Sequence, residues 1–339
     1  MVDATHKWFN ASDRSYFSII KKEVHALALL HRFPEKRIAE IDLIIAELTS
    51  NLGKYATGGY ILLGWIECTG NGAIEILSVD NGPGIADTGR VLSDGYSTSN
   101  TLGHGLGSVK RMSDFFDIYS LKGWGTIVVS RIYLDRQENS LRTFFPQFQP
   151  LVISKQGETT SGDGFVIRRG DRTVKFMLAD GLGHGPEANL AVNEAARAFH
   201  SVVSVSPVEI IRHMHTAVRK TRGLVAMVGV ADMIHKTVRF AGVGNISAKL
   251  YGTGLTSKSV LCYNGIIGHN IPSTMNDNVQ SLEAFPELIL CSDGIRSRWD
   301  VSKYTGINRY DPVIKAAALL KDFNRLTDDS SVVAIKFKK

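Results

Sequence analysis

Apolar residues recur at helical spacing in two stretches near the start of the chain. The apolar positions of the first stretch are Phe17, Ile20, Val24 and Leu27. The spacing predicts one helix over 15–30 and a second over 35–55. Pro34 stands beside the first turn of the second helix, where proline is tolerated, and Gly58 and Gly59 follow its end. Both boundaries of the second helix therefore follow from the local sequence.

Alternation of apolar and polar positions predicts strands after these helices. The turn sequence at 70–72, Gly-Asn-Gly, joins two of the strands into a hairpin. The segment 80–107 is rich in Gly and Ser, and we expect a long ordered loop there. The expected strands cover 60–68, 73–79 and two parts of 117–133, with a helix over 107–116. The polar segment 138–150, which contains Pro146 and Pro150, predicts a linker.

The second half mixes helices and strands in another order. Its expected helices cover 186–203, 207–222 and 311–323. Its expected strands cover 151–156, 164–168, 173–179, 224–234, 237–243, 247–251, 288–292 and 331–337. Because both halves mix the two element types, the expected fold class is α/β (α+β), in two domains over 1–137 and 151–339.

Length and composition agree with two globular domains in a reducing compartment. A chain of 339 residues is long for a single domain. No apolar run reaches the roughly 18 residues that cross a bilayer, and the start lacks the pattern of a signal peptide. The three cysteines, Cys68, Cys262 and Cys291, are far apart and form no CxxC pair. We expect a cytoplasmic protein with no membrane insertion and no disulfide framework.

The net charge of +6 is carried by the second half. Residues 1–137 hold 14 Lys and Arg against 15 Asp and Glu, whereas residues 138–339 hold 25 against 18. The basic residues are scattered and show no dense stripe or aromatic interleaving, which argues against nucleic-acid binding. A basic rim that attracts an acidic phosphoprotein explains the excess equally well.

Two residues of the second helix have the chemistry of a nucleotide site. Glu47 and Asn51 lie four positions apart and therefore share one face of the helix. A carboxylate there can act as a general base, and an amide oxygen one turn later can ligate Mg²⁺. Taken alone, a surface Glu and Asn would explain the pair as well.

Two glycine motifs further along strengthen the case for a nucleotide. Asp80, at the end of an expected strand, can accept a hydrogen bond from a purine amine, and Gly82 and Gly84 let the backbone approach the base. The sequence Gly-His-Gly-Leu-Gly at 103–107 then opens a helix, whose free N–H groups suit phosphates. One such motif is weak, but three in this order predict an ATP site.

These stretches resemble the GHKL ATPase fold, and most of all the RsbT-type serine kinases and anti-sigma factors. The matching stretches are Glu47–Asn51, Asp80–Ile85, Asp94–Thr98, Gly103–Met112 and Gly125–Thr126. The resemblance implies a Bergerat-type α/β sandwich that binds ATP and Mg²⁺. It makes Glu47 the base, Asn51 the Mg²⁺ ligand and Asp80 the adenine anchor. The other implied cofactor-binding residues are Gly82, Gly84, Gly103, His104, Gly105, Leu106, Gly107 and Thr126. His104 departs from the small or aliphatic residue more usual there.

Four aspartates of the second half each stand near the end of an expected strand. They are Asp163, Asp180, Asp293 and Asp328. Carboxylates gathered from separate strand ends commonly hold two Mn²⁺ or Mg²⁺ ions, which activate water for attack on a phosphoryl group. Each Asp-Gly pair alone is more often a simple turn, but four in this order predict a metal centre.

The second half resembles the metal-dependent PPM-type serine/threonine phosphatases, in particular the SpoIIE and RsbX branch. The string Asp-Gly-Leu-Gly-His-Gly at 180–185 carries the resemblance most specifically. An α-β-β-α sandwich is implied, with Asp180 and Asp293 catalytic. The implied metal ligands are Asp163, Asp180, the Gly181 carbonyl, Asp293 and Asp328, with Asp329 in support. His184 is a candidate donor to the leaving oxygen, and Arg168, Arg169 and Arg172 are the candidates for a phosphate clamp.

Together the two resemblances imply a bifunctional bacterial signalling protein. A serine/threonine switch kinase would be fused to a phosphoserine/phosphothreonine phosphatase, both acting on STAS-type anti-anti-sigma or stressosome-like proteins. In the alternative, the GHKL half is a non-catalytic module that binds ATP and presents a docking surface. The sequence leaves open whether both sites share one substrate and whether the chain forms a homodimer.

Overall fold

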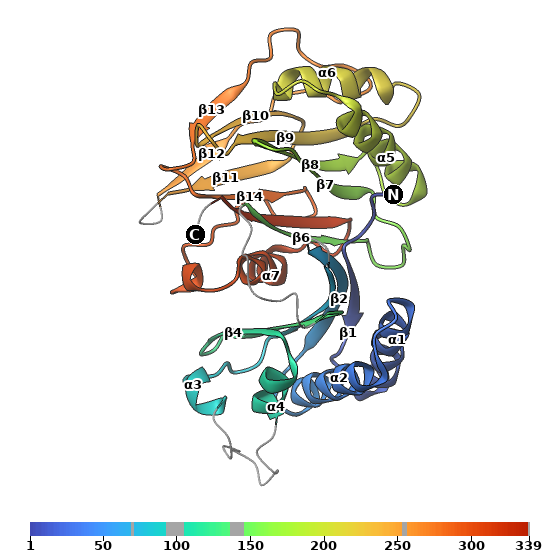
Figure 1. Cartoon of the computed structure of the whole chain (residues 1–339), viewed down its shortest axis with the longest axis vertical. Coiled ribbons are helices and arrows are strands. Elements are labelled where there is room, and N and C mark those ends of the chain that lie inside the picture. The colour runs from blue at the N-terminus through green and yellow to red at the C-terminus, as the bar shows by residue number, and fades with distance from the viewer. Residues whose placement is uncertain (69–70, 93–104, 136–145, 253–255, 338–339) are drawn as a thin grey trace. The chain divides into compact units, whose positions relative to one another are not determined.

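Figure 1 shows the computed structural model of the chain. The structure describes residues 1–68, 71–92, 105–135, 146–252 and 256–337. The chain divides into two compact units. The N-unit comprises His6–Arg142 and Ile307–Ile314, and the C-unit comprises Met1–Thr5, Thr143–Gly306 and Lys315–Lys339. Each unit therefore contains a short segment from the opposite end of the sequence.

The N-unit is a five-stranded antiparallel sheet covered by helices on one face. The sheet order is β1-β2-β3-β5-β4. The strands are β1 (His6–Asn10), β2 (Gly59–Cys68), β3 (Asn71–Asp80), β4 (Phe115–Leu121) and β5 (Gly125–Tyr133). The helices are α1 (Phe17–Leu30), α2 (Glu35–Tyr55), α3 (Thr88–Val91) and α4 (Gly105–Met112), with a 3-10 turn at Arg14–Tyr16. Alternate β3 residues, such as Ile74 and Ile76, pack with α1 and α2 in one apolar core.

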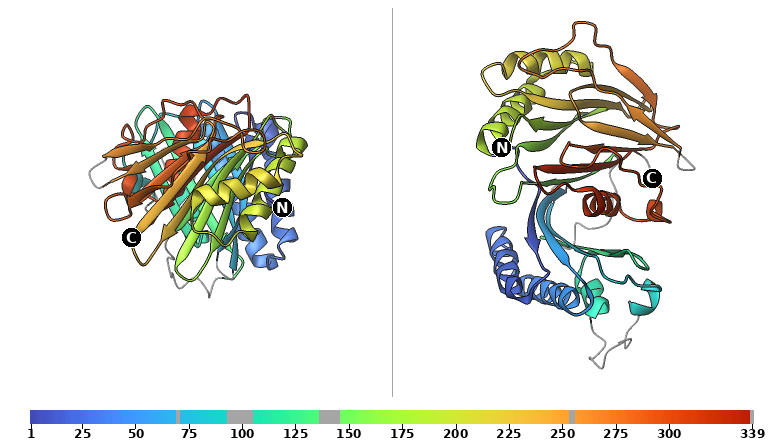
Figure 2. Two further views of the ribbon diagram at one scale, coloured as in Figure 1. Left: turned by 90° about the horizontal axis from the view of Figure 1, so that it is seen from above. Right: turned by 180° about the vertical axis from the view of Figure 1, so that it is seen from behind.

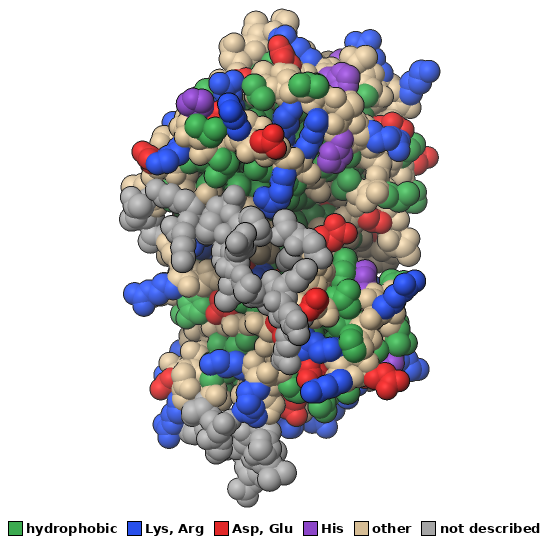
Figure 3. Space-filling model, in the orientation of Figure 1, with side chains coloured by type: hydrophobic (Ala, Val, Ile, Leu, Met, Phe, Trp, Pro, Cys, Tyr) green, Lys and Arg blue, Asp and Glu red, His purple; other side chains and the backbone are tan. Residues whose placement is uncertain are grey.

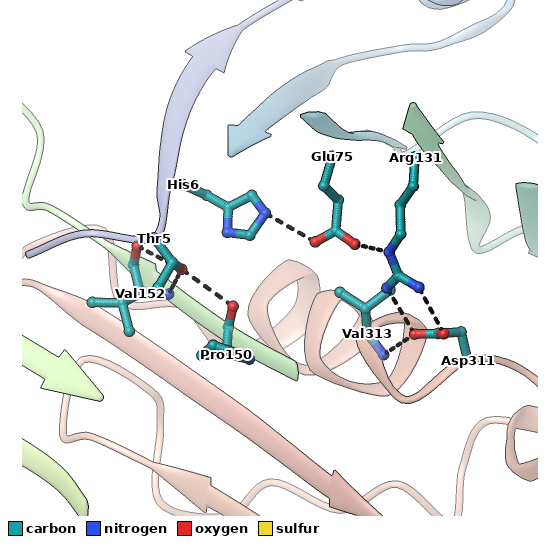
Figure 4. A network of polar contacts seen from close by, with 8 residues as sticks. All are labelled: Thr5, His6, Glu75, Arg131, Pro150, Val152, Asp311 and Val313. Carbon is teal, nitrogen blue, oxygen red and sulfur yellow. Dashed lines mark hydrogen bonds and ion pairs between the residues drawn. The ribbon is translucent and has the colours of Figure 1, made fainter. Parts of the chain in front are cut away.

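The face of this sheet away from the helices carries one row of polar residues. His6, Gly64, Glu75 and Arg131 are register partners on four neighbouring strands. Gly64 has no side chain, so His6 Nε2 reaches across it to Glu75 Oε1 at 3.0 Å. Arg131 pairs with Glu75 and makes a two-pronged contact with Asp311, at 2.9 and 3.0 Å (Figure 4). The segment Ile307–Ile314 is thus bound into the N-unit by a buried charge.

The C-unit contains two stacked five-stranded sheets. One has the order β13-β10-β9-β8-β7 and the other β12-β11-β14-β15-β6. The first sheet comprises β7 (Asp163–Arg169), β8 (Thr173–Gly181), β9 (Leu224–Asp232), β10 (Thr237–Val243) and β13 (Asn278–Ser281). The second comprises β6 (Gln147–Ile153), β11 (Ser247–Tyr251), β12 (Ser257–Val260), β14 (Glu287–Cys291) and β15 (Ser330–Lys336).

Helices cover the outer faces of this pair of sheets (Figure 2). Helices α5 (Pro186–Ser201) and α6 (Pro207–Ala217) pack on the first sheet, and α7 (Pro312–Phe323) lies beside the second. An apolar cluster that includes Phe176, Phe240 and Phe337 fills the space between the sheets. The expected α-β-β-α sandwich is therefore present.

The main helices agree with the sequence prediction, and the differences have local causes. The helix expected over 107–116 ends at Met112, because Phe115 already pairs in β4. Residues 147–150, expected in the linker, belong to β6, where Pro150 is tolerated because β6 is an edge strand. The short edge strands β1, β12 and β13 had no predicted counterpart.

Three further observations concern the surface, the cysteines and the length of the helices. On the face in Figure 3, Lys and Arg side chains lie among Asp and Glu side chains. Cys262 and Cys291 are free thiols. No helix in the described part of the chain is long and apolar enough to cross a membrane.

Candidate functional site

The first and the third nucleotide motifs of the N-unit meet at the start of α4. Glu47 and Asn51 project from α2, and α4 begins at Gly105. A Cβ atom placed on Gly105 would lie 3.9 Å from both Glu47 Oε2 and Asn51 Oδ1. The fold therefore brings the acid and the amide close to Gly105. Gly103 and His104 lie outside the described residues.

Asp80 ends strand β3 and is fixed by backbone donors. Its Oδ1 accepts hydrogen bonds from the N–H of Gly82 at 2.7 Å and of Thr126 at 3.2 Å. A Cβ on Gly82 would stand 2.9 Å from the same carboxylate oxygen. Thr126 is buried, and its hydroxyl contacts that of Ser120 at 2.9 Å. Asp80, Gly82 and Thr126 therefore form one small cluster.

Three other expected cofactor residues have clear packing roles. Gly84 has a φ of +73°, and a Cβ there would overlap the carbonyl of Leu121. Leu106 packs against the apolar core of the N-unit, and Gly107 is buried within α4. Gly84 therefore acts through the backbone, whereas Leu106 acts through the packing of its side chain.

In the C-unit the predicted aspartates converge from both sheets. Asp163 and Asp180 are register partners on β7 and β8. Asp163 Oδ2 accepts hydrogen bonds from the hydroxyls of Ser292 and Ser331, each at 2.7 Å. Ser292 follows β14 and Ser331 lies in β15, so these bonds join the ends of the second sheet to β7 of the first.

Further bonds hold the remaining acids. Asp329 accepts the N–H of Lys155 at 2.8 Å and of Gly162 at 2.9 Å. Asn245 donates to Asp293 Oδ2 at 3.0 Å. The sequence predicted a supporting role for Asp329. It did not predict that Asn245 holds Asp293, or that Ser292 and Ser331 hold Asp163. The only sequence signal was that the two serines stand within the Ser-Asp-Gly and Asp-Asp-Ser-Ser strings.

Burial and the nearness of the other acids raise the pKa values of Asp163 and Asp180. Burial raises the pKa of Asp180 well above its ordinary value, and the charges of Asp163, Asp293, Asp328 and Asp329 raise it further. Burial also raises the pKa of Asp163, to about 7, although the hydrogen bonds from the Ser331 and Ser292 hydroxyls lower it. Within the described residues, none of these five carboxylates forms an ion pair with Lys, Arg or His.

The donor set suits a hard divalent cation, although it is not in ligating geometry. No group of three or more His, Cys, Asp or Glu side chains in the described ranges is arranged to hold a metal ion. The available donors are carboxylate and carbonyl oxygens, which Mg²⁺ and Mn²⁺ prefer. A cation would also supply the positive charge that the five acids lack, so the residues fit such a group.

Comparison with known proteins finds different relatives for different parts of the chain. Residues 170–338 match the family described as Stage II sporulation protein E (SpoIIE). The serine/threonine-protein kinase RsbT of Bacillus subtilis (strain 168) is 42% identical over 88 residues, which are 26% of this chain and 66% of RsbT. The phosphoserine phosphatase RsbX of the same organism is 23% identical over 143 residues, which are 42% of this chain and 71% of RsbX.

The chain resembles RsbT in its N-terminal half and the SpoIIE and RsbX phosphatases in its C-terminal half. A solved structure agrees with this fold. It is described as "The bacterial stressosome: a modular system that has been adapted to control secondary messenger signaling". Its sequence is 25% identical and the TM-score is 0.52, over 56% of this chain and 99% of that one.

In the SpoIIE- and RsbX-like half, two of the arginines considered for a phosphate clamp have other partners. Arg168 donates to the carbonyls of His200 and Val202, at 2.6 and 2.8 Å, at the end of α5. The guanidinium of Arg169 lies over the ring of Phe148, 5.5 Å from its centre. His184 Nδ1 contacts Glu158 Oε1 at 2.8 Å, so its ring is held at the start of α5.

Proposed function

We propose that the C-unit is a metal-dependent phosphoserine/phosphothreonine protein phosphatase. The observation that carries the proposal is the convergence of five carboxylates from both sheets without an ion-pair partner among the described residues. Asp163 and Asp329 are buried, and carboxylates that crowd one another are costly to keep charged unless a cation binds them. The similarity to RsbX and to the SpoIIE family supports the same reaction.

The residues of this proposed site have three kinds of role: binding cations, orienting carboxylates and donating a proton. Asp180, Asp293, Asp328 and the Gly181 carbonyl would hold the cations, and Asp163 would lie beside them. When bound, two Mn²⁺ or Mg²⁺ ions supply Lewis-acid activation and neutralise charge on the phosphoryl oxygens. Asn245 and the serine hydroxyls fix the carboxylates through hydrogen bonds. His184, held by Glu158, is the proposed proton donor to the leaving serine or threonine oxygen.

Replacement of Asp180 tests the phosphatase. Asp180→Asn removes one charge at the centre of the acidic set, and we expect Mn²⁺-dependent phosphate release from a phosphoserine protein to fall about 100-fold or more. Asp277→Asn is the matched control, because Asp277 accepts the N–H of Val208 at the start of α6. Release that stays at the wild-type rate in Asp180→Asn would refute the metal centre.

For the N-unit we infer ATP- and Mg²⁺-dependent phosphorylation of a serine or threonine on a protein partner. Glu47 would accept the proton of the partner's hydroxyl, and Asn51 would bind Mg²⁺ beside the phosphates. Asp80, oriented by two backbone N–H groups, would accept from the adenine amine. The approach of Gly105 to Glu47 and Asn51 and the similarity to RsbT support these roles.

A second candidate is a non-catalytic ATP-gated module that binds a partner. Both candidates predict ATP binding, but only the kinase needs a base. The position of Glu47 beside Asn51 and α4 favours the kinase. By its relatives' chemistry, the partner we propose is a STAS-domain protein in the bacterial cytoplasm, within an anti-sigma or stressosome pathway.

Labelled ATP separates the two candidates. With a STAS protein present, we expect wild type to transfer label and Glu47→Ala to lose transfer by about 100-fold while it retains ATP binding. Glu23→Ala is the control, since Glu23 is an exposed carboxylate on α1 that pairs with Lys7. If wild type binds ATP but transfers no label, the binding module is the correct reading.

A further inference from the structure

The first five residues of the chain are part of the C-unit. We call Met1–Thr5 the N-terminal strap. Thr5 is fixed to strand β6: its N–H donates to the Val152 carbonyl at 2.9 Å, and its hydroxyl accepts the Val152 N–H at 2.9 Å. The next residue, His6, already belongs to the N-unit and contacts Glu75 (Figure 4). One peptide bond therefore separates the strap from the N-unit.

Two asparagines of α5 bind the backbone of Val2. Asn193 Oδ1 accepts the Val2 N–H at 2.7 Å, and Asn193 Nδ2 donates to the Val2 carbonyl at 3.0 Å. Asn189, which is buried, donates to the same carbonyl at 3.0 Å and to the carbonyl of Ser161 at 2.8 Å. Asn189 thus connects the strap to the loop that leads into β7.

The side chain of Val2 occupies space left by a glycine of β7. A Cβ atom on Gly164 would lie 2.5 Å from Val2 Cγ1 and 2.6 Å from Val192 Cγ1. Only glycine leaves this room, because real Cβ atoms do not approach other atoms so closely. The residue after Asp163 is therefore matched in shape to the strap.

Asp3 contacts the acidic loop directly. Its Oδ1 accepts the N–H of Ser161 at 2.8 Å, as well as the N–H of Ala4 at 2.7 Å. Ser161 is fully buried, and its hydroxyl oxygen accepts the N–H of Asp163 at 3.1 Å. A continuous chain of hydrogen bonds thus runs from Asp3 through Ser161 to Asp163, one of the five carboxylates.

We propose that the strap is an integral part of the phosphatase centre and that Asp3 is a positioning residue for Asp163. This inference rests on the proposed phosphatase function. Asp3 acts through Ser161 and touches no substrate. The strap binds the loop at 161–164 through the N–H of Ser161, and Asp329 binds the same loop through the N–H of Gly162. A loop held at two neighbouring N–H groups keeps Asp163 in one orientation.

The test uses three full-length variants. Asp3→Ala removes the acceptor for Ser161, whereas Asp3→Asn keeps an oxygen in its place and removes only the charge. Asp277→Ala is the control, because it also deletes a carboxylate that accepts one backbone N–H, at 2.9 Å, in the same unit. Amide hydrogen exchange of the segment 159–166 and Mn²⁺ binding by calorimetry, without substrate, are the readouts.

We expect Asp3→Ala to speed exchange in this segment and to weaken Mn²⁺ binding about tenfold, with near wild-type behaviour in Asp3→Asn and in the control. Wild-type exchange in Asp3→Ala would overturn the proposal. So would an Asp3→Asn variant as impaired as Asp3→Ala, because the hydrogen bond would then not be the cause. If wild type binds no Mn²⁺ and releases no phosphate, the phosphatase function fails, and the exchange data still decide whether the strap orders the loop.

Discussion

At the scale of single residues, Glu75 shows how a charge can be buried at the centre of a sheet. Burial alone would raise the pKa of Glu75, but Arg131 and His6 together lower it to about 2. Arg131 is held charged in turn, since Glu75 and Asp311 raise its pKa well above the ordinary value despite burial. Each charge in the row is thus compensated by the next one.

The lowered pKa makes stability depend on pH in a defined window. The pKa of Glu75 falls from an ordinary 4.5 to about 2 on folding. The carboxylate therefore contributes its full stabilisation above pH 4.5 and loses it as the pH falls toward 2. The shift corresponds to about 3 kcal/mol of unfolding free energy. Urea unfolding at pH 7, 4.5 and 3 measures this loss in the wild type.

Glu75→Gln supplies the comparison for that titration. We expect the variant to be less stable at pH 7 by about 3 kcal/mol and to show a shallower loss of stability below pH 4.5. Glu67→Gln is the control, because Glu67 is an exposed carboxylate on the neighbouring strand β2. An acid dependence equally steep in Glu75→Gln and wild type would contradict the assignment.

The sequence identified the acids of the C-unit but not the groups that orient them. Each predicted aspartate stands in a short string with glycine or a second acid, so it can be recognised locally. Ser331, by contrast, acts on Asp163 across 168 positions of sequence, and Asp3 on Ser161 across 158. Such partnerships depend on how the two sheets and the strap pack, which no local pattern encodes.

At the scale of elements, periodicity predicted the long helices well and the edge strands poorly. Helix α2 has the expected bounds, because its apolar stripe, its preceding proline and its following glycines all agree. Strands β12 and β13 have four residues each, and their side chains are mostly exposed. Their alternation is too short to stand out, and only pairing with β11 and β10 defines them.

The end of α5 gives a prediction about Arg168. Its guanidinium satisfies two carbonyls that the helix itself cannot, and Lys175 Nζ donates to the nearby carbonyls of Val202, Val203 and Ser204. We expect Arg168→Ala to lower the unfolding free energy by about 1–2 kcal/mol and to leave the phosphatase kcat unchanged. Chemical denaturation and phosphate release measure the two effects.

Arg197→Ala is the control for this variant, since Arg197 is an exposed residue of α5 that pairs with Glu194. We expect its stability to change by less than about 0.5 kcal/mol. A large loss of phosphate release in Arg168→Ala at unchanged stability would instead return Arg168 to the phosphate clamp for which the sequence made it a candidate.

At the scale of the whole molecule, the two halves of the sequence and the two compact units do not coincide. Met1–Thr5 belongs to the C-unit and Ile307–Ile314 to the N-unit. Composition and the polar segment after residue 137 indicate a division into two, and the structure contains two units. The exchanged segments could not be predicted, because a linear boundary assigns every residue to the half in which it stands.

The exchange has a consequence for how such a protein can be taken apart or recombined. A single crossover in the gene between the two halves would give one product a C-unit without Val2 and Asp3, and the other an N-unit in which Arg131 has lost Asp311. No single boundary along the sequence separates the two units. A cut at one position between residues 137 and 151 therefore yields two fragments that each lack a segment of their own compact unit.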